Sequence, residues 1–139
     1  MERYYTTIEQ SMHLMDLGLN PKTCNKSYWL NEQKEWELED EQDVAITHDL
    51  FSFRNHYVYP CWSVGALIDL IPKTIVLNKK EYSMCLQTLT HCYSLCHTDG
   101  RFLNTLGCQI ISKNLIDVVY QYVIWLMESG YIHGNKPNN

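Results

Sequence analysis

Three features that mark well-known classes of protein are missing from this chain of 139 residues. Its six glycines are scattered singly, which excludes the glycine-rich loop that binds phosphate groups. It has no cluster of lysine and arginine, so the sequence favours neither a nucleic-acid binder nor a binder of anionic membranes. No apolar run is long enough to span a bilayer. These absences leave a globular protein whose activity is not indicated by any motif.

A secretory signal is also missing, because residues 1–7 contain neither a basic segment nor an apolar run. We therefore expect a cytoplasmic protein, in which cysteines remain reduced. Several of the six cysteines lie inside apolar runs, where a free thiol behaves as a small hydrophobic side chain. The sequence predicts no disulfide framework.

The composition is typical of a folded protein, with 45% hydrophobic and 19% charged residues. The length predicts a single domain over residues 1–139, which is large enough to form one core. We expect an acidic surface excursion at about residues 31–47, since no hydrophobic period is sustained there, and a frayed polar tail at residues 133–139.

The net charge of −5 is concentrated in residues 32–43, which contain seven of the sixteen acids and one of the eleven bases. The remainder, with nine acids and ten bases, is nearly neutral. Trp36 stands within this run, and an aromatic side chain amid negative charge can dock on a basic partner. The alternative is a solvated loop that keeps the protein soluble. The residues expected to contact a partner are Trp36, Glu37, Glu39, Asp40 and Glu41.

The first helix begins at Thr6 or Thr7, because a carboxylate or amide side chain follows each of them three positions later, as in a reciprocal capping box. It ends near Leu17, since Gly18 is suited to the left-handed conformation that closes many helices. A long apolar helix is expected after Asn114, which can cap it, and Gly130 supplies its end. Such a helix, apolar on most of its circumference, is normally buried against two layers or another chain.

A third helix is predicted between Ser63, as its cap, and Pro72, which cannot continue the helical hydrogen bonds. Period-two patterns predict strands elsewhere, and Asp99-Gly100 is suited to a tight hairpin turn. The predicted strands are 50–59, 74–77, 81–89, 91–98 and 102–109. We therefore predict an α+β fold, in which an antiparallel meander of three to five strands packs with a long C-terminal helix and two shorter helices.

Two candidate reactive sites have structural alternatives. His91, Cys92, Cys96 and His97 are possible zinc ligands, but on a strand the cysteines and the histidines point to opposite faces, which opposes a tetrahedral site. Ser63 lies in a sequence similar to a nucleophile elbow, but the helix-cap role explains it without further partners. We expect no catalytic residue, no metal and no cofactor.

Three segments resemble a known family: residues 7–23, residues 60–72 around Pro60-Cys61-Trp62-Ser63, and residues 114–130. The chain is similar in these segments to small cytoplasmic proteins of gut Bacteroidetes and of their phage-like or conjugative elements. Cys61 and Leu115 replace the alanine and proline common in that family, and both substitutions preserve the caps. The resemblance implies an α+β fold, a cytoplasmic bacterial or phage origin, and no particular activity.

The hypothesis favoured by the sequence is a non-enzymatic accessory protein that acts through contacts with an unknown protein partner. One alternative is an acidic inhibitor or immunity-type protein that binds a basic partner through residues 32–43. The other is a small metal- or thiol-dependent protein that uses residues 91–97. The sequence leaves homo-oligomerisation open.

Overall fold

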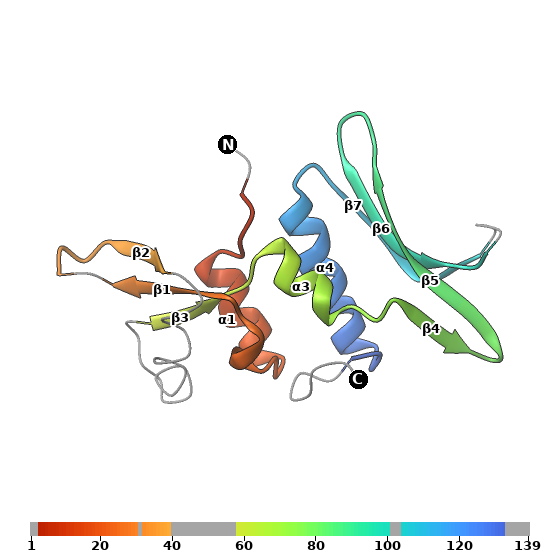
Figure 1. The fold of residues 1–139 in the computed structure, drawn as a ribbon, viewed down its shortest axis with the longest axis horizontal. Helices are drawn as coiled ribbons and strands as arrows, with labels where there is room; N and C mark the ends of the chain where they lie inside the picture. Colours follow the sequence, from red (N-terminus) through yellow and green to blue (C-terminus); the bar gives the residue numbers. More distant parts are fainter. Residues whose placement is uncertain (1–2, 31, 40–57, 101–103, 133–139) are drawn as a thin grey trace.

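The computed structural model describes residues 3–30, 32–39, 58–100 and 104–132 (Figure 1). The predicted α+β fold class is confirmed, with two antiparallel sheets and a long C-terminal helix. In chain order the elements are α1 (Ile8–Asp16), a 3-10 turn η1 (Pro21–Thr23), β1 (Lys26–Leu30), β2 (Trp36–Glu39), β3 (Val58–Cys61), α3 (Val64–Leu70), β4 (Thr74–Leu77), β5 (Lys80–Thr88), β6 (Tyr93–Thr98), β7 (Thr105–Ser112) and α4 (Leu115–Glu128). The predicted tail at 133–139 and residues 40–57 lie outside the described ranges.

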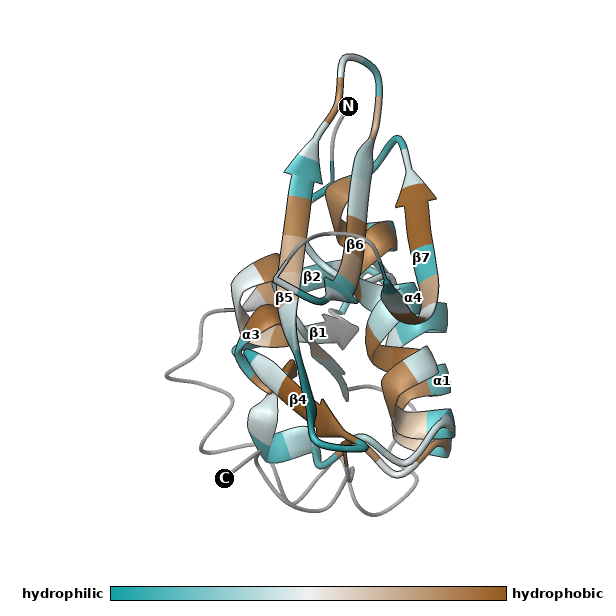
Figure 2. Cartoon of the chain, turned by 90° about the vertical axis from the view of Figure 1, so that its right-hand side faces the viewer, coloured by the Kyte–Doolittle hydropathy of each residue, from teal (hydrophilic) through white to brown (hydrophobic). Residues whose placement is uncertain are grey.

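The second half of the chain forms the predicted meander, a sheet of four antiparallel strands in the order β4-β5-β6-β7. One face of this sheet packs against α4, which contacts both β6 and β7. Figure 2 shows β5, β6 and β7 in front of α4, seen from the side of the sheet that points away from the helix. We call that side the outer face.

The predicted two-residue turn at Asp99-Gly100 is wrong. Thr98 pairs with Thr105, and the Asp99 N–H donates to the Asn104 carbonyl over 3.0 Å. Because the strand pairing extends to Asp99 and Asn104, the connection between β6 and β7 is longer than the predicted two-residue turn.

The first half of the chain forms a second sheet, in the order β2-β1-β3, which was not expected from the sequence. Residues 31–47 were expected to form a surface excursion, but residues 36–39 form a strand that pairs with residues 26–30, with Ser27 opposite Glu39 and Leu30 opposite Trp36. The period-two alternation of residues 36–39 indicates this strand, but the density of acids obscured it. The sheet projects from the rest of the molecule like a wing (Figure 1).

The helix ends are formed by local interactions, as predicted. Thr7 caps α1 and forms a reciprocal capping box with Gln10. Both α1 and α4 close with a glycine of positive φ, Gly18 at 98° and Gly130 at 80°. The residue after each glycine donates its N–H to a buried leucine carbonyl one turn back, which is the Schellman arrangement.

The predicted cap of α4 is only half right. Asn114 occupies the N-cap position, but its side chain makes no hydrogen bond to the helix backbone. Its Nδ2 atom instead donates to the Asp117 carboxylate over 3.2 Å, and the same carboxylate accepts from Arg3 and Gln10. These contacts join the start of α4 to the N-terminal segment and to α1.

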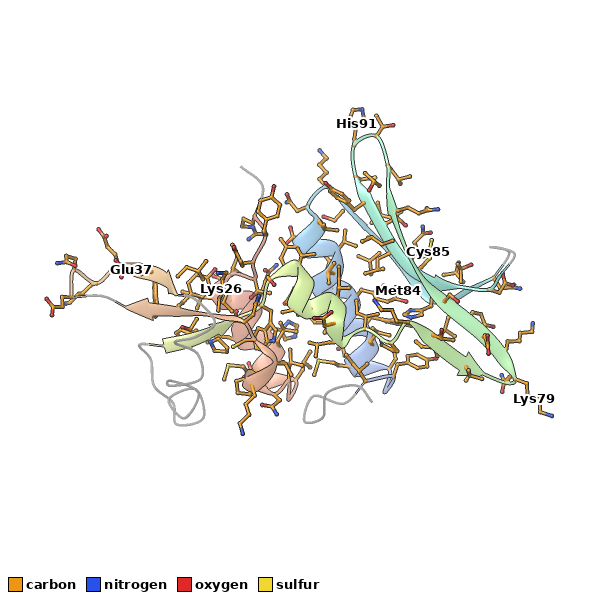
Figure 3. The ribbon with its side chains drawn as sticks, in the orientation of Figure 1. Lys26, Glu37, Lys79, Met84, Cys85 and His91 are labelled. Atoms are coloured by element: carbon orange, nitrogen blue, oxygen red, sulfur yellow. The ribbon has the colours of Figure 1, made fainter. Side chains whose placement is uncertain are left out.

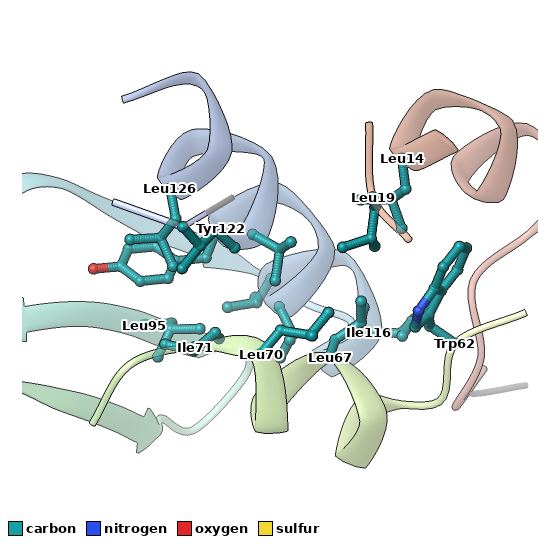
Figure 4. Close-up of a cluster of buried hydrophobic side chains, with 14 of the residues drawn as sticks. Leu14, Leu19, Trp62, Leu67, Leu70, Ile71, Leu95, Ile116, Tyr122 and Leu126 are labelled. Atoms are coloured by element: carbon teal, nitrogen blue, oxygen red, sulfur yellow. The ribbon is translucent and has the colours of Figure 1, made fainter. Parts of the chain in front are cut away.

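The core is built around α4, whose apolar circumference packs against the four-stranded sheet, α3 and the segment after α1 (Figure 4). Leu126, Tyr122 and Ile116 on this helix are fully buried. Gly107 of β7 lies directly under the ring of Trp125, because a Cβ atom at this position would approach the ring to 1.9 Å. The predicted burial of this helix against more than one layer is confirmed.

Candidate protein-interaction surface

Strand β2 separates its aromatic and acidic side chains onto two faces. Successive side chains of a strand point to opposite sides, so Trp36 and Leu38 share one face and Glu37 lies on the other. Glu37 stands away from the wing in Figure 3. The side chains of Trp36 and Leu38 are 41% and 40% exposed to solvent. The wing therefore has one face with large exposed apolar side chains and another with a carboxylate.

The register extends the apolar face across all three strands. Tyr28 of β1 lies opposite both Leu38 of β2 and Tyr59 of β3. The rings of Trp36 and Tyr59 are in contact, with centroids 5.5 Å apart and a tilt of 57°. We call Tyr28, Trp36, Leu38 and Tyr59 the aromatic face. Its members come from three strands and form one continuous surface of rings and aliphatic carbon.

A cleft of about 420 Å³ lies at the base of the aromatic face. It is lined by Tyr28 and by the start of α1, at Thr7, Ile8 and Glu9. Tyr28 thus belongs to both the face and the cleft. Among the described lining residues, a partner side chain that enters the cleft would meet the Tyr28 ring, the Ile8 side chain and the Glu9 carboxylate.

The base of the wing is held rigidly against the N-terminal segment. The Thr6 carbonyl accepts hydrogen bonds from the Tyr28 hydroxyl at 2.7 Å and from the Cys61 thiol at 3.5 Å. The Trp62 N–H donates to Thr6 Oγ1 at 3.0 Å. The ammonium group of Lys26 stands 5.4 Å from the centre of the Tyr5 ring, at a distance that permits a cation–π contact. These contacts fix the position of Tyr28, and so the shape of the cleft.

The buried acid groups near this base remain protonated. Burial raises the pKa of the Cys61 thiol to about 11 and that of Cys24 to about 12. Burial also raises the pKa of Tyr28, and the neighbouring Cys61 adds to the effect. A thiol must ionise to act as a nucleophile, so Cys24 and Cys61 serve packing and hydrogen bonding.

The structure describes the position of only part of the predicted contact set. Trp36 is exposed as expected, but it shares a face with aromatic and aliphatic residues, whereas Glu37 points to the opposite side. Glu39 pairs with Ser27 at the end of β2. Asp40 and Glu41 lie outside the described residues. The acids predicted to surround Trp36 are thus not all beside it.

The sequence did not predict several members of the aromatic face and the cleft. These are Tyr28 and Tyr59 on the face, and Ile8 and Glu9 in the cleft. The missed signal is the alternation of apolar and acidic residues over 36–39, which places Trp36 and Leu38 on a common face. The pairing of Tyr28 with Tyr59 joins strands far apart in the chain, and no local pattern indicates such a pairing.

The predicted metal candidates do not converge. His97 is fully buried, with its Nε2 atom 2.7 Å from the Pro72 carbonyl and its Nδ1 atom 2.6 Å from the Tyr122 hydroxyl. A carbonyl only accepts, so Nε2 carries the proton and Nδ1 accepts from the tyrosine. Cys96 lies on the outer face and His91 at the far tip of the β5–β6 hairpin (Figure 3). Among residues 3–30, 32–39, 58–100 and 104–132, no three possible ligands form a metal-binding group.

Ser63 is a helix cap, as predicted. Its Oγ atom accepts from the Ala66 N–H at 3.1 Å and from Asn25 Nδ2 at 2.7 Å. The Asn25 side chain also accepts from the Ser63 N–H at 3.0 Å. The hydroxyl is therefore committed to holding α3 against the turn before β1.

Comparisons with known proteins identify no relative of this chain. No family model matches the chain, and neither a curated protein nor a solved structure is significantly similar to it. Within the part of the chain that the structure describes, the helices are too short or too polar to cross a membrane. The surface of the wing is therefore the main guide to function.

Proposed function

We propose that this protein is a non-enzymatic interaction protein, and that it binds a basic segment of a protein partner on the aromatic face. The observation that supports this proposal is the pair of large apolar side chains, Trp36 and Leu38, that the wing leaves about 40% exposed. Tryptophan and tyrosine are the residues most often found at the energetic centre of protein interfaces. They bury a large area on binding and have few rotatable bonds to fix.

The charge of the sequence segment that contains Trp36 favours a basic partner. Residues 32–43 carry seven acids and one base, and Glu9 lines the cleft beside Tyr28. A lysine or arginine side chain of the partner could stack its cation on the rings and direct its charge to Glu9. An acidic partner would be repelled by the same groups.

The resemblance of residues 7–23, 60–72 and 114–130 to proteins of gut Bacteroidetes and their mobile elements favours a bacterial cytoplasm as the place of action and implies no activity. The accessory role rests on the exposed aromatic surface. Purification of the tagged protein from its native host, in parallel with the Trp36→Ala variant, would test this role. A partner retained equally by both proteins would contradict it.

A selection from a random peptide library tests the binding surface even though the partner is unidentified. Peptides are selected on the wild-type protein and counter-selected on the Trp36→Ala variant. We expect enriched peptides that combine lysine or arginine with aliphatic or aromatic residues, and an affinity that falls about tenfold or more in the variant, because an anchor residue contributes roughly 2 kcal/mol. Affinity should also weaken with added salt.

Val76→Ala supplies the matched control, because Val76 is 63% exposed but lies on β4, far from the wing in Figure 1. Selected peptides should bind this variant as they bind the wild type. Enriched peptides without basic residues, or equal affinity for the wild type and Trp36→Ala, would exclude the proposed surface.

A second function, an acidic inhibitor or immunity-type protein, is favoured by the separation of Glu37 from Trp36 on opposite sides of β2. This alternative predicts that the acidic residues capture the partner. Reversing Glu37, Glu39 and Glu41 to lysine would then abolish binding, whereas Trp36→Ala would leave it intact. The aromatic-face proposal predicts the reverse order, with Trp36→Ala the more damaging change.

A further inference from the structure

Two cysteines face each other across the central strands of the four-stranded sheet. Cys85 of β5 is the register partner of Cys96 of β6. Leu95 and His97 are buried toward the core, so Cys96, which lies between them, points to the outer face. Cys85 shares that face because directly paired residues lie on the same side of a sheet. Figure 3 labels Cys85 next to Met84 on the four-stranded sheet.

The strand pairing determines the separation of the two cysteines. The Leu89 N–H donates to the Cys92 carbonyl over 2.8 Å, and hydrogen-bonded pairs recur at every second position of an antiparallel ladder. Cys85 and Cys96 are therefore a hydrogen-bonded pair, with Cα atoms about 5.5 Å apart. Disulfides bridge Cα separations of about 4.4 to 6.8 Å, so the backbone permits a bond between them.

The Cys85 thiol is more accessible to solvent than the Cys96 thiol. Cys85 is partly exposed and Cys96 retains 7% of its surface. Burial raises the pKa of the Cys96 thiol, and the neighbouring Cys85 raises it further. Cys85 is therefore the thiol that a reagent reaches first, and Cys96 is the adjacent thiol that can complete an exchange.

We propose that Cys85 and Cys96 form a reversible disulfide when the protein meets a small-molecule disulfide. The Cys85 thiolate attacks one sulfur of the reagent, forms a mixed disulfide and releases one small thiol. Cys96 then loses its proton to solvent and attacks Cys85 Sγ, which releases the second small thiol. The protein loses two electrons and two protons, and one small-molecule disulfide is reduced to two thiols.

The geometry makes this bond easy to reduce. Directly paired residues of a sheet have Cβ atoms about 4.5 to 5.5 Å apart, whereas a disulfide prefers about 3.8 Å. The two strands must therefore move together locally, and a strained disulfide is more readily reduced than a relaxed one. The pair is suited to sensing the thiol–disulfide balance around the protein.

Oxidation of the folded protein with glutathione disulfide tests the proposal. After incubation, remaining thiols are alkylated and the peptides are mapped by mass spectrometry. We expect loss of alkylation at Cys85 and Cys96, a cross-linked peptide that joins them, and recovery of both thiols after addition of excess reduced glutathione. The intact mass should fall by two hydrogen atoms.

Cys85→Ser should abolish the cross-link, whereas Cys92→Ser should leave it unchanged, since Cys92 lies outside β6. A thermal melt of each variant confirms that it is folded before oxidation. A cross-link from Cys96 to Cys108, a stable mixed disulfide at Cys85 without ring closure, or unaltered alkylation of both thiols would each overturn the proposal.

Discussion

The two sheets of this protein differ in what their faces contact. The four-stranded sheet packs one face against α4, and the side chains there belong to the core or bond to buried partners, as His97 does. The three-stranded sheet is held at its base by the N-terminal segment, and its aromatic face retains large exposed side chains. The covered face of the four-stranded sheet thus belongs to the core, whereas the aromatic face of the wing presents large side chains to solvent.

This difference shows why exposure is more informative here than residue type. Tyr122 and Tyr28 both make hydrogen bonds through their hydroxyls. Tyr122 is fully buried, so its ring contributes to folding, whereas Tyr28 lines an open cleft. Substitutions in the two sheets should therefore separate stability from binding.

The largest expected effect on stability comes from truncating a buried leucine of α4, the helix that covers the four-stranded sheet. Truncating an exposed leucine of the wing is the comparison. Leu126→Ala removes a fully buried side chain and leaves a cavity, so it should lower the free energy of unfolding by about 3 kcal/mol. Leu38→Ala, at a side chain that is 40% exposed, should change it by less than about 0.5 kcal/mol. Urea denaturation of both variants measures the difference, and equal losses would contradict the comparison.

Gly107→Ala should destabilise the covered sheet by about 2 kcal/mol or more, because it combines crowding with an unfavourable backbone conformation. The glycine has a φ of 64°, and an added Cβ would lie 1.9 Å from the Trp125 ring. Gly100→Ala is the control, since no atom of the described residues lies within 4 Å of the added atom. Thermal melting compares the two, and similar melting temperatures would contradict the predicted contact.

Two histidine–tyrosine pairs allow a finer test. Tyr122→Phe removes the buried hydroxyl that donates to His97 and should cost about 1 kcal/mol of stability. Tyr120→Phe removes the hydroxyl that contacts His13 at 2.8 Å in an exposed position, and should cost less. Urea midpoints of both variants decide the order, and a larger loss for Tyr120→Phe would exclude the buried hydrogen bond as a source of stability.

A pH dependence follows from the same buried pair. Burial lowers the pKa of His97, although the contact with the Pro72 carbonyl partly offsets this effect. The unfolded chain therefore binds a proton at a pH where the folded chain does not, so stability is retained above the ordinary pKa of about 6.5 and falls as the pH drops below it. Comparison of the unfolding free energy at about pH 7.5 and about pH 5.5 should show this loss. His97→Gln should reduce this loss of unfolding free energy at low pH. If the loss is unchanged in the variant, the pH dependence arises from other groups.

The elements that depend on neighbouring residues could be predicted from the sequence. The capping box at Thr7 and the closing glycines Gly18 and Gly130 act within one helical turn, so their spacing alone is sufficient. The meander was also predicted, because its strands follow one another and pair with their neighbours. The connections after Thr88 and after Thr98 are longer than expected.

The wing could not be predicted, because its stability depends on distant partners. β1 pairs with β3 across residues 31–57, and each of the strands β2 and β3 has only four residues. The acidic residues around Trp36 in the sequence identified it as a contact residue. The face to which its side chain points was not predicted, because a side chain in a loop and one in a strand are oriented differently. The shared face with Tyr28 and Tyr59 follows only from the register.

Chemical-shift mapping by NMR, with a peptide from the library selection, tests the central claim most directly. We predict that the largest changes on titration occur at Tyr28, Trp36, Leu38 and Tyr59, and that amides of β5, β6 and β7 remain nearly unchanged. Changes confined to the four-stranded sheet, with the wing unaffected, would contradict the assignment of the aromatic face as the binding surface.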